Sequence, residues 1–184
     1  MQPLNPKSRF DQYGTKINRT HSPALAYGIP WVMIAFFSLT PVLPVIASAP
    51  VVPPLGFIAF LAWMVYRPGL LPFWAGIPLG LFDDMLSGQP IGSAVLLWST
   101  TILAIEAVEA RLPWRGFRQD WLTASVILAV YLICAAMIAG VLPTAPLLIS
   151  IGLQLAVSVL IFPLMAKLVS LLDQFRLRRW KEVG

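Results

Sequence analysis

Two neighbouring aspartates, Asp83 and Asp84, are the strongest candidates in this chain for a functional site, because paired carboxylates can bind cations or accept hydrogen bonds. They lie in the stretch from Gly76 to Gly92, which reads GIPLGLFDDMLSGQPIG and follows a long apolar region. A carboxylate at hydrocarbon depth costs roughly 2.5 to 3.5 kcal/mol, so it usually has a partner, a pathway or a fixed contact. The alternative is that both aspartates mark the place where a short helix leaves the lipid for water.

The sequence gives little indication of a metal-binding site or a catalytic nucleophile. Prenyl transferases bind metal ions with paired aspartates, but that chemistry needs a further acidic residue, and Ser87 stands where it would lie. The single histidine, His21, and the single cysteine, Cys134, have no neighbours suited to metal binding. The sequence contains neither a Gly-x-Ser-x-Gly motif nor a Walker loop. We therefore expect no enzyme activity and no cofactor.

A second acidic pair, Glu106 and Glu109, is three residues apart and shares one face of a helix. These side chains are expected to pair with Arg111 or Arg115 at the membrane surface. A proton relay is the alternative, but the sequence offers no further intramembrane ionisable residues to complete a path.

The central stretch also carries a small residue or aspartate at every fourth position. On a helix these positions form one narrow stripe, which lets two helix backbones approach closely in a bilayer. Pro78 and Pro90 limit this helix, so we expect it to continue to about Ser87 and to be followed by a turn. The predicted function of the stripe is helix docking, with Asp84 accepting a hydrogen bond from a helix of the same chain or of a partner. The stripe comprises Gly76, Gly80, Asp84, Gly88 and Gly92.

Composition predicts the fold class. Hydrophobic residues make up 58% of the 184 residues, charged residues 11%, and the mean hydropathy is +0.79. The apolar runs are continuous and far longer than the roughly 20 residues that a helix needs to cross a bilayer. We therefore expect an all-α, polytopic integral membrane protein that forms one bundle.

Prolines and charges divide this bundle into six expected transmembrane helices. Breaks are expected in the proline-rich piece between Pro41 and Pro54, at the tight turn Arg67-Pro68-Gly69, and between Pro143 and Pro146. The expected domains are a tail over 1–22, a six-helix domain over 23–172 and a basic tail over 173–184. The expected spans are about 27–47, 54–66, 70–87, 91–107, 121–142 and 147–171.

Charge distribution predicts the orientation. All 13 lysines and arginines lie in the two tails, at Arg67, in the connector between spans four and five, or at Lys167. The positive-inside rule then places both termini in the cytoplasm and the two aspartates toward the outer face. The formal net charge of +5 is explained by topology and lipid, without nucleic acid. The residues expected to contact the membrane surface are Arg176, Arg178, Arg179 and Lys181.

Two further patterns concern the membrane boundary. Ala47-Ser48-Ala49 superficially resembles a signal-peptidase site, but the preceding apolar run is too long, so retention as an anchor is favoured. Most of the seven tryptophans lie near expected span ends, where an interfacial belt forms. For three of these tryptophans, the alternative to the interfacial belt is that the side chain faces a cavity. These three are Trp31, Trp74 and Trp98.

The motif in the central stretch resembles that of a known family. Gly80-Leu81-x-x-Asp84-x-x-x-Gly88-x-x-x-Gly92, with Pro90 before the last glycine, is similar to the pattern of the bacterial rod shape-determining protein MreD family. The match covers about thirteen residues, from Gly80 to Gly92, and Asp84 falls at the characteristic aspartate.

This resemblance implies a non-enzymatic inner-membrane component of the machinery that elongates the cell wall. It implies MreC as a partner, and through the complex the MreB filament and the glycosyltransferase and transpeptidase that build the wall. The alternative is a small-molecule-binding subunit similar to the S components of energy-coupling-factor vitamin transporters. In that alternative, Asp84 and nearby aromatic residues form the ligand pocket.

Overall fold

The computed structural model describes residues 19–20, 23–42, 52–111, 116–140, 144–176 and 181–182, and within them the chain is helical apart from one pair of two-residue strands. The expected all-α fold class is confirmed at this level. The elements in chain order are β1 (Arg19–Thr20), α1 (Pro23–Ser38), the 3-10 turn η3 (Thr40–Val42), α2 (Leu55–Tyr66), the 3-10 turn η4 (Phe73–Ala75), α3 (Gly76–Ser87), α4 (Ser93–Arg111), α5 (Phe117–Ile138), α6 (Ala145–Arg176) and β2 (Lys181–Glu182).

Three helices are long and apolar enough to cross a membrane, which makes this chain a candidate membrane protein. They cover Ser93–Arg111, Phe117–Ile138 and Ala145–Phe175. Tyr27–Val42 and Leu55–Tyr66 are apolar but shorter. A helix of 12 residues such as α2 is about 18 Å long, well short of the ~30 Å hydrocarbon core.

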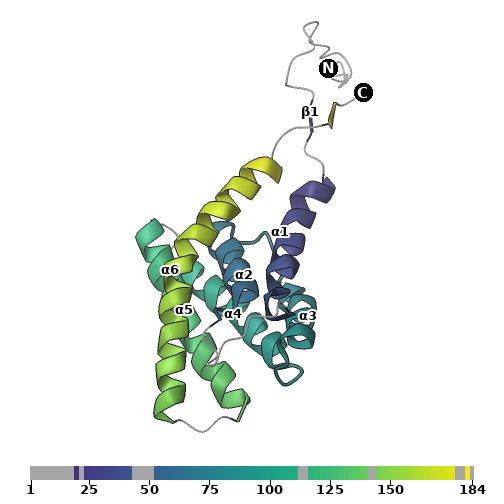
Figure 1. Cartoon of the computed structure of the whole chain (residues 1–184). Coiled ribbons are helices and arrows are strands. Elements are labelled where there is room, and N and C mark those ends of the chain that lie inside the picture. The colour runs from purple at the N-terminus through teal and green to yellow at the C-terminus, as the bar shows by residue number, and fades with distance from the viewer. Residues whose placement is uncertain are drawn as a thin grey trace, which may run out of the picture.

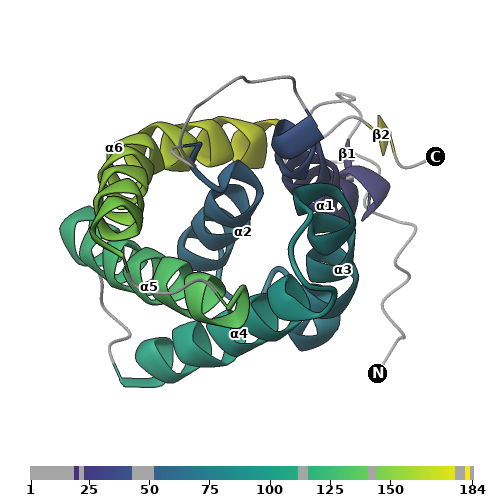
Figure 2. The ribbon, with the colours of Figure 1, turned by 60° about the horizontal axis from the view of Figure 1, so that its bottom comes forward.

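The short helix α2 forms the centre of the molecule. Figure 2 shows it enclosed by the other helices, and every residue from Gly56 to Val65 is buried. Its sequence, LGFIAFLAWMVY, is apolar on all sides, as expected of a helix that is surrounded by protein. The ring of Phe57 stacks on Tyr131 of α5 at a centroid distance of 3.8 Å, and Phe60 stacks on Trp98 of α4 at 4.8 Å.

Two tryptophans belong to this core. Trp63 and Trp98 are fully buried, and the Trp63 indole donates a hydrogen bond to Met33 Sδ at 3.0 Å. The expected interfacial position is therefore wrong for Trp63, because contacts from neighbouring helices cover the end of α2. Trp31 and Trp74 contact one another at a centroid distance of 5.6 Å. Trp114 and Trp180 lie outside the described residues.

The ends of α2 and α3 agree with the sequence prediction, whereas α1 ends at Ser38, earlier than the residue 47 expected for the first span. α2 follows Pro54 and ends at Tyr66. The turn expected at Arg67-Pro68-Gly69 is confirmed, since the Leu70 amide donates to the Arg67 carbonyl at 3.2 Å and Gly69 has φ of 75°. α3 ends at Ser87, as expected, with Gly88 in the left-handed conformation typical of a helix C-terminus.

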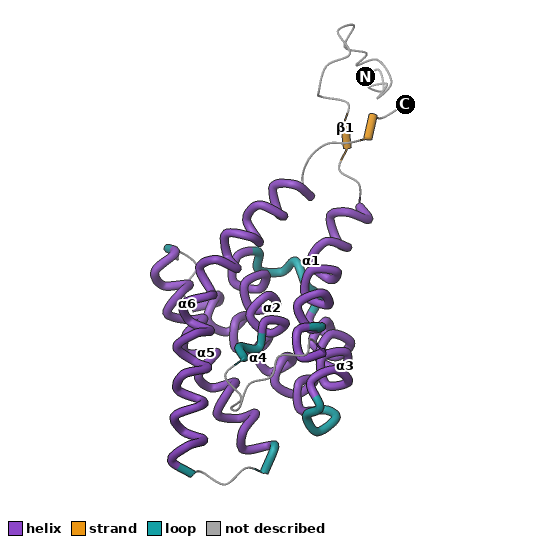
Figure 3. The backbone as a smooth tube through the Cα atoms, viewed as in Figure 1, coloured by secondary structure: helices purple, strands orange, loops and turns teal. Residues whose placement is uncertain are grey.

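The first and last described elements meet at one end of the bundle. β1 and β2 pair in an antiparallel register with Arg19 opposite Glu182, and the turn between α3 and α4 lies at the opposite end (Figures 1 and 3). The 32-residue α6 changes direction along its length (Figure 1) and contains Pro163, whose missing N–H is a usual cause of a kink. Arg176 ends α6 and Lys181 lies in β2. Arg178 and Arg179 fall outside the described residues.

Candidate functional site

Gly76 and Gly80 are the closest points of contact between α3 and α4. A Cβ atom built on Gly80 would lie 2.7 Å from the backbone Cα of Val95, and one on Gly76 would lie 2.8 Å from the backbone nitrogen of Ser99. Carbon atoms do not approach backbone this closely, so only glycine allows the observed helix separation. The helix that docks on the Gly76 and Gly80 face is α4 of the same chain.

Gly88 and Gly92 do not belong to this contact. They follow the end of α3 with φ of 68° and 97°, and a Cβ on either would meet nothing within 4 Å. The expectation of a five-position stripe is therefore wrong at these two residues, because positive φ ends the helix and turns the chain toward α4. Pro90 lies in the same turn and its carbonyl accepts a hydrogen bond from the Ser93 amide at 3.0 Å. Leu81 is 43% exposed on α3.

Asp84 ties the end of α3 to the start of α4. Its carboxylate accepts hydrogen bonds from the Gly92 amide at 2.8 Å, from the Ser93 hydroxyl at 2.9 Å and from the Ala94 amide at 2.9 Å. The side chain is 2% exposed. The N-terminus of a helix has free N–H groups and a partial positive charge, both of which stabilise a carboxylate. Asp84 therefore closes the α3–α4 hairpin.

Asp83 lies on another side of α3, away from α4, and borders a cavity. It is 8% exposed. A Cβ on Gly56 of α2 would lie 3.0 Å from Asp83 Oδ1 and 2.2 Å from Ser38 Oγ, so Gly56 allows these three segments to meet. Next to Asp83 is a cavity of about 300 Å³ between the ends of α1 and α3, the start of α2, and the sides of α5 and α6. We call it the Asp83 cavity.

The Asp83 cavity combines apolar walls with several polar side chains. Its lining residues are Phe37, Thr40, Pro41, Val52, Pro53, Pro54, Leu55, Gly56, Asp83, Ser87, Gln89, Tyr131 and Gln154. The Gln154 amide nitrogen donates to the Val52 carbonyl at 2.7 Å, which fixes the orientation of that side chain. Thr40 Oγ1 donates to the Phe37 carbonyl. This mixture of walls and few polar groups is typical of small-molecule sites.

The alternative function put Asp84 in a ligand pocket, but in the structure Asp83 lines the cavity and Asp84 binds the start of α4. Successive helix residues point about 100° apart, so only one of two adjacent aspartates can face α4. Gln89 and Gln154 are the other signals that the sequence offered. Gln154 is a polar side chain in an otherwise apolar segment, Gln89 lies in the turn after α3, and both line the cavity.

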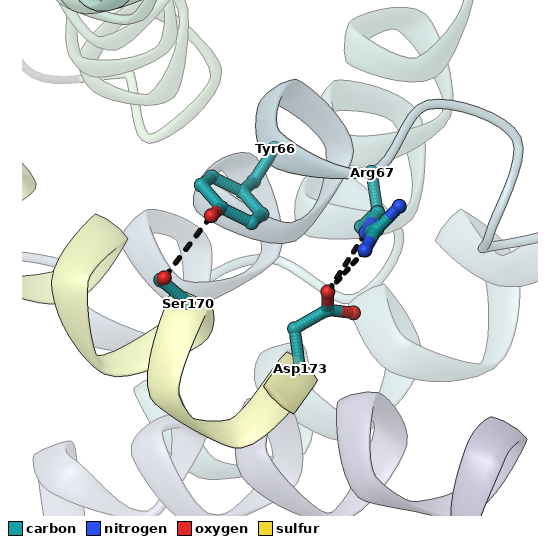
Figure 4. A network of polar contacts seen from close by, with 4 residues as sticks. All are labelled: Tyr66, Arg67, Ser170 and Asp173. Atoms are coloured by element: carbon teal, nitrogen blue, oxygen red, sulfur yellow. Dashed lines mark hydrogen bonds and ion pairs between the residues drawn. The ribbon is translucent and has the colours of Figure 1, made fainter. Parts of the chain in front are cut away.

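A polar network joins α2 to α6 at the opposite end of the bundle (Figure 4). The Arg67 guanidinium donates to Asp173 Oδ2 from Nε at 2.8 Å and from Nη2 at 2.5 Å, and the Tyr66 hydroxyl donates to Ser170 Oγ at 3.0 Å. The hydrogen bond with Asp173 raises the pKa of Arg67 above its usual value, so Arg67 stays charged. These contacts hold the turn after α2 against α6.

The remaining predicted residues do not gather into a site. Glu106 is exposed and Glu109 half-buried on the last turns of α4. Cys134 is half-buried on α5 and lines an apolar groove between α4 and α5. Among the residues that the structure describes, no group of three or more histidine, cysteine, aspartate or glutamate side chains could hold a metal ion.

Comparisons with models of protein families, with curated proteins and with solved structures find no match to this chain.

Proposed function

We propose that this protein is an MreD-like, non-enzymatic component of the complex that elongates the bacterial cell wall. The observation that carries the proposal is the arrangement of the residues behind the resemblance. Gly80 gives close helix contact, Asp84 binds the start of α4, and Gly88 and Gly92 shape the turn between them. A motif whose members build one hairpin together is a structural unit and not a chance set of glycines.

The proposed topology is six spans in the inner membrane with both termini in the cytoplasm. Three long apolar helices support membrane insertion. α1, α2 and the η4–α3 segment complete the six, with α2 shielded from lipid by its neighbours. The absence of lysine and arginine from the three loops at the other end supports the orientation.

The proposed partners are MreC and, through the complex, MreB and the wall-building glycosyltransferase and transpeptidase. Because α4 occupies the Gly76 and Gly80 face, we infer that MreC contacts another surface of the bundle. In this scheme the hairpin motif sets the shape of the protein, and the partner recognises that shape.

Depletion of the protein in its own bacterium tests the proposal. We expect rods to widen into spheres and lyse as existing copies are diluted by growth. Re-expressed wild-type protein and the control variant Gly152→Leu should restore rods, since a Cβ at Gly152 meets nothing within 4 Å. Gly80→Leu should not restore them. Normal shape after full depletion would refute the proposal.

The alternative function is a small-molecule-binding subunit similar to an S component of a vitamin transporter. The Asp83 cavity is the observation that favours it. The same depletion separates the two functions, because a transport subunit predicts unchanged shape together with growth that depends on a supplied vitamin.

A further inference from the structure

We propose that the Asp83 cavity binds a primary ammonium group, carried by an aminophospholipid headgroup or by a small water-soluble amine. This proposal concerns a site that the hairpin motif does not use. It holds whether the protein acts in wall elongation or in transport, so its test is independent of the cell-shape experiment.

Among the residues that the structure describes, those lining the Asp83 cavity include a carboxylate and no cationic side chain. Asp83 is almost completely buried, and none of the residues that line its cavity is lysine, arginine or histidine. The surrounding sequence cannot supply a cation either, because no charged residue occurs between Ser22 and Tyr66 or between Trp121 and Ala166. Arg67 binds Asp173 at the other end of α2. A buried carboxylate without a counter-charge is costly, so a cation from outside the chain is the natural partner.

The cavity also offers hydrogen-bond acceptors beside the Asp83 carboxylate. An ammonium group has three N–H donors and no acceptor. Beside the Asp83 carboxylate, the cavity presents the Ser87 hydroxyl, which is buried and has no hydrogen-bond partner among the described residues. Because the amide nitrogen of Gln154 binds the Val52 carbonyl, its carbonyl oxygen is the atom available to a ligand. One carboxylate and two neutral oxygens match three donors.

The cavity fits a primary ammonium group better than it fits other classes of ligand. An anion lacks a cationic partner in the cavity. A divalent metal ion would rely on Asp83 as its single carboxylate, since Asp84 is committed to α4. A quaternary ammonium has the charge but no N–H groups for Ser87 and Gln154. The cavity of about 300 Å³ is at the small end of ligand sites and suits an ethanolamine-sized group.

The test uses purified full-length protein in lipid nanodiscs. One set contains phosphatidylglycerol with phosphatidylethanolamine, and the other contains phosphatidylglycerol with phosphatidylcholine. Native mass spectrometry counts the zwitterionic lipids retained per protein. A separate thermal-unfolding series in detergent adds millimolar ethanolamine. Choline, a quaternary ammonium ion with the same charge but no N–H donors, is the matched control.

We expect the wild type to retain phosphatidylethanolamine in preference to phosphatidylcholine. Asp83→Asn should reduce that retention by about tenfold or more, because it removes a charge-assisted hydrogen bond. Ser87→Ala should reduce it less and keeps the test valid if Asp83→Asn folds poorly. Glu106→Gln removes a carboxylate outside the cavity and should retain lipid as the wild type does.

Each outcome decides the proposal. Ethanolamine stabilisation that depends on Asp83, without lipid preference, supports the ammonium site and identifies a water-soluble amine as its source. Lipid preference that depends on Asp83 identifies the headgroup. If neither lipid retention nor amine stabilisation differs between wild type, Asp83→Asn and Ser87→Ala, the proposal is wrong.

Discussion

Asp83 and Asp84 are adjacent in the chain, buried to a similar degree and opposite in their surroundings. Asp84 accepts hydrogen bonds from three donors at the start of α4, whereas Asp83 borders a cavity lined by five helices and the 3-10 turn η3. The α3–α4 hairpin is therefore held by hydrogen bonds within the chain, whereas Asp83 faces a cavity with room for a small ligand. The difference teaches that burial alone does not assign a role to a carboxylate in a helical bundle. The role depends on which hydrogen-bond donors surround the carboxylate.

The largest loss of stability should come from a bulky side chain at the close contact between α3 and α4. We expect Gly80→Leu to lower the free energy of unfolding by about 3 kcal/mol or more, because its side chain would overlap the backbone of α4 at Val95. Thermal unfolding in detergent measures this loss. Gly152→Leu is the matched control at an open helical position and should unfold near the wild-type temperature. Equal stability of the two variants would contradict the close contact.

The next effect should come from Asp84→Asn. An asparagine offers one acceptor oxygen and turns an N–H donor toward the other amides of the hairpin, so we expect a loss on the order of 2 kcal/mol. Hydrogen exchange at the Gly92 and Ala94 amides, which donate to Asp84, should accelerate in the variant. Unchanged exchange at both amides would show that the carboxylate does not hold the start of α4.

A smaller effect is expected at the opposite end of the bundle. Arg67→Met removes the cation that neutralises Asp173, whose side chain is 5% exposed, while that of Arg67 is 46% exposed. Because solvent screens the arginine, we expect a loss of about 1 kcal/mol in thermal unfolding. Arg67→Lys keeps the charge without the two-nitrogen fork and should fall between wild type and Arg67→Met. If Arg67→Lys is no more stable than Arg67→Met, the stabilisation depends on the geometry of the guanidinium and not on its charge.

The smallest effect on stability should come from Asp83→Asn. With no cation among the described residues of the cavity lining, the buried charge is a cost to the folded protein, so its removal should not lower the free energy of unfolding and should raise it by about 1 kcal/mol at most. The comparison with Asp84→Asn is the sharpest one that this chain offers, since the two substitutions are identical in chemistry and one residue apart. Equal losses in the two variants, measured in the same thermal series, would refute the division between a fixed hairpin and an open cavity.

The sequence predicted the helical class and the ends of α2 and α3 because those depend on local chemistry. Continuous apolar runs, the Arg67-Pro68-Gly69 turn and the end of α3 at Ser87 follow from hydrophobicity, proline and glycine. The sequence named Asp84 as the hydrogen-bond acceptor for the docked helix, but it left open whether that helix belongs to this chain. It also did not predict that Asp83 lines a cavity, because that depends on how α3 is rotated against its neighbours. It also placed Trp63 near the membrane boundary, since no local signal shows that other helices cover α2.

The central position of α2 has a consequence for how this protein is made. α2 leaves the ribosome before α4, α5 and α6, all of which contact it in the finished bundle. At about 18 Å it is too short to hold itself across a bilayer. It therefore depends on helices synthesised later, and above all on α6, which follows the other five helices in the chain. A chain that stops before α6 should leave α2 without its final cover and become a substrate for membrane quality-control proteolysis.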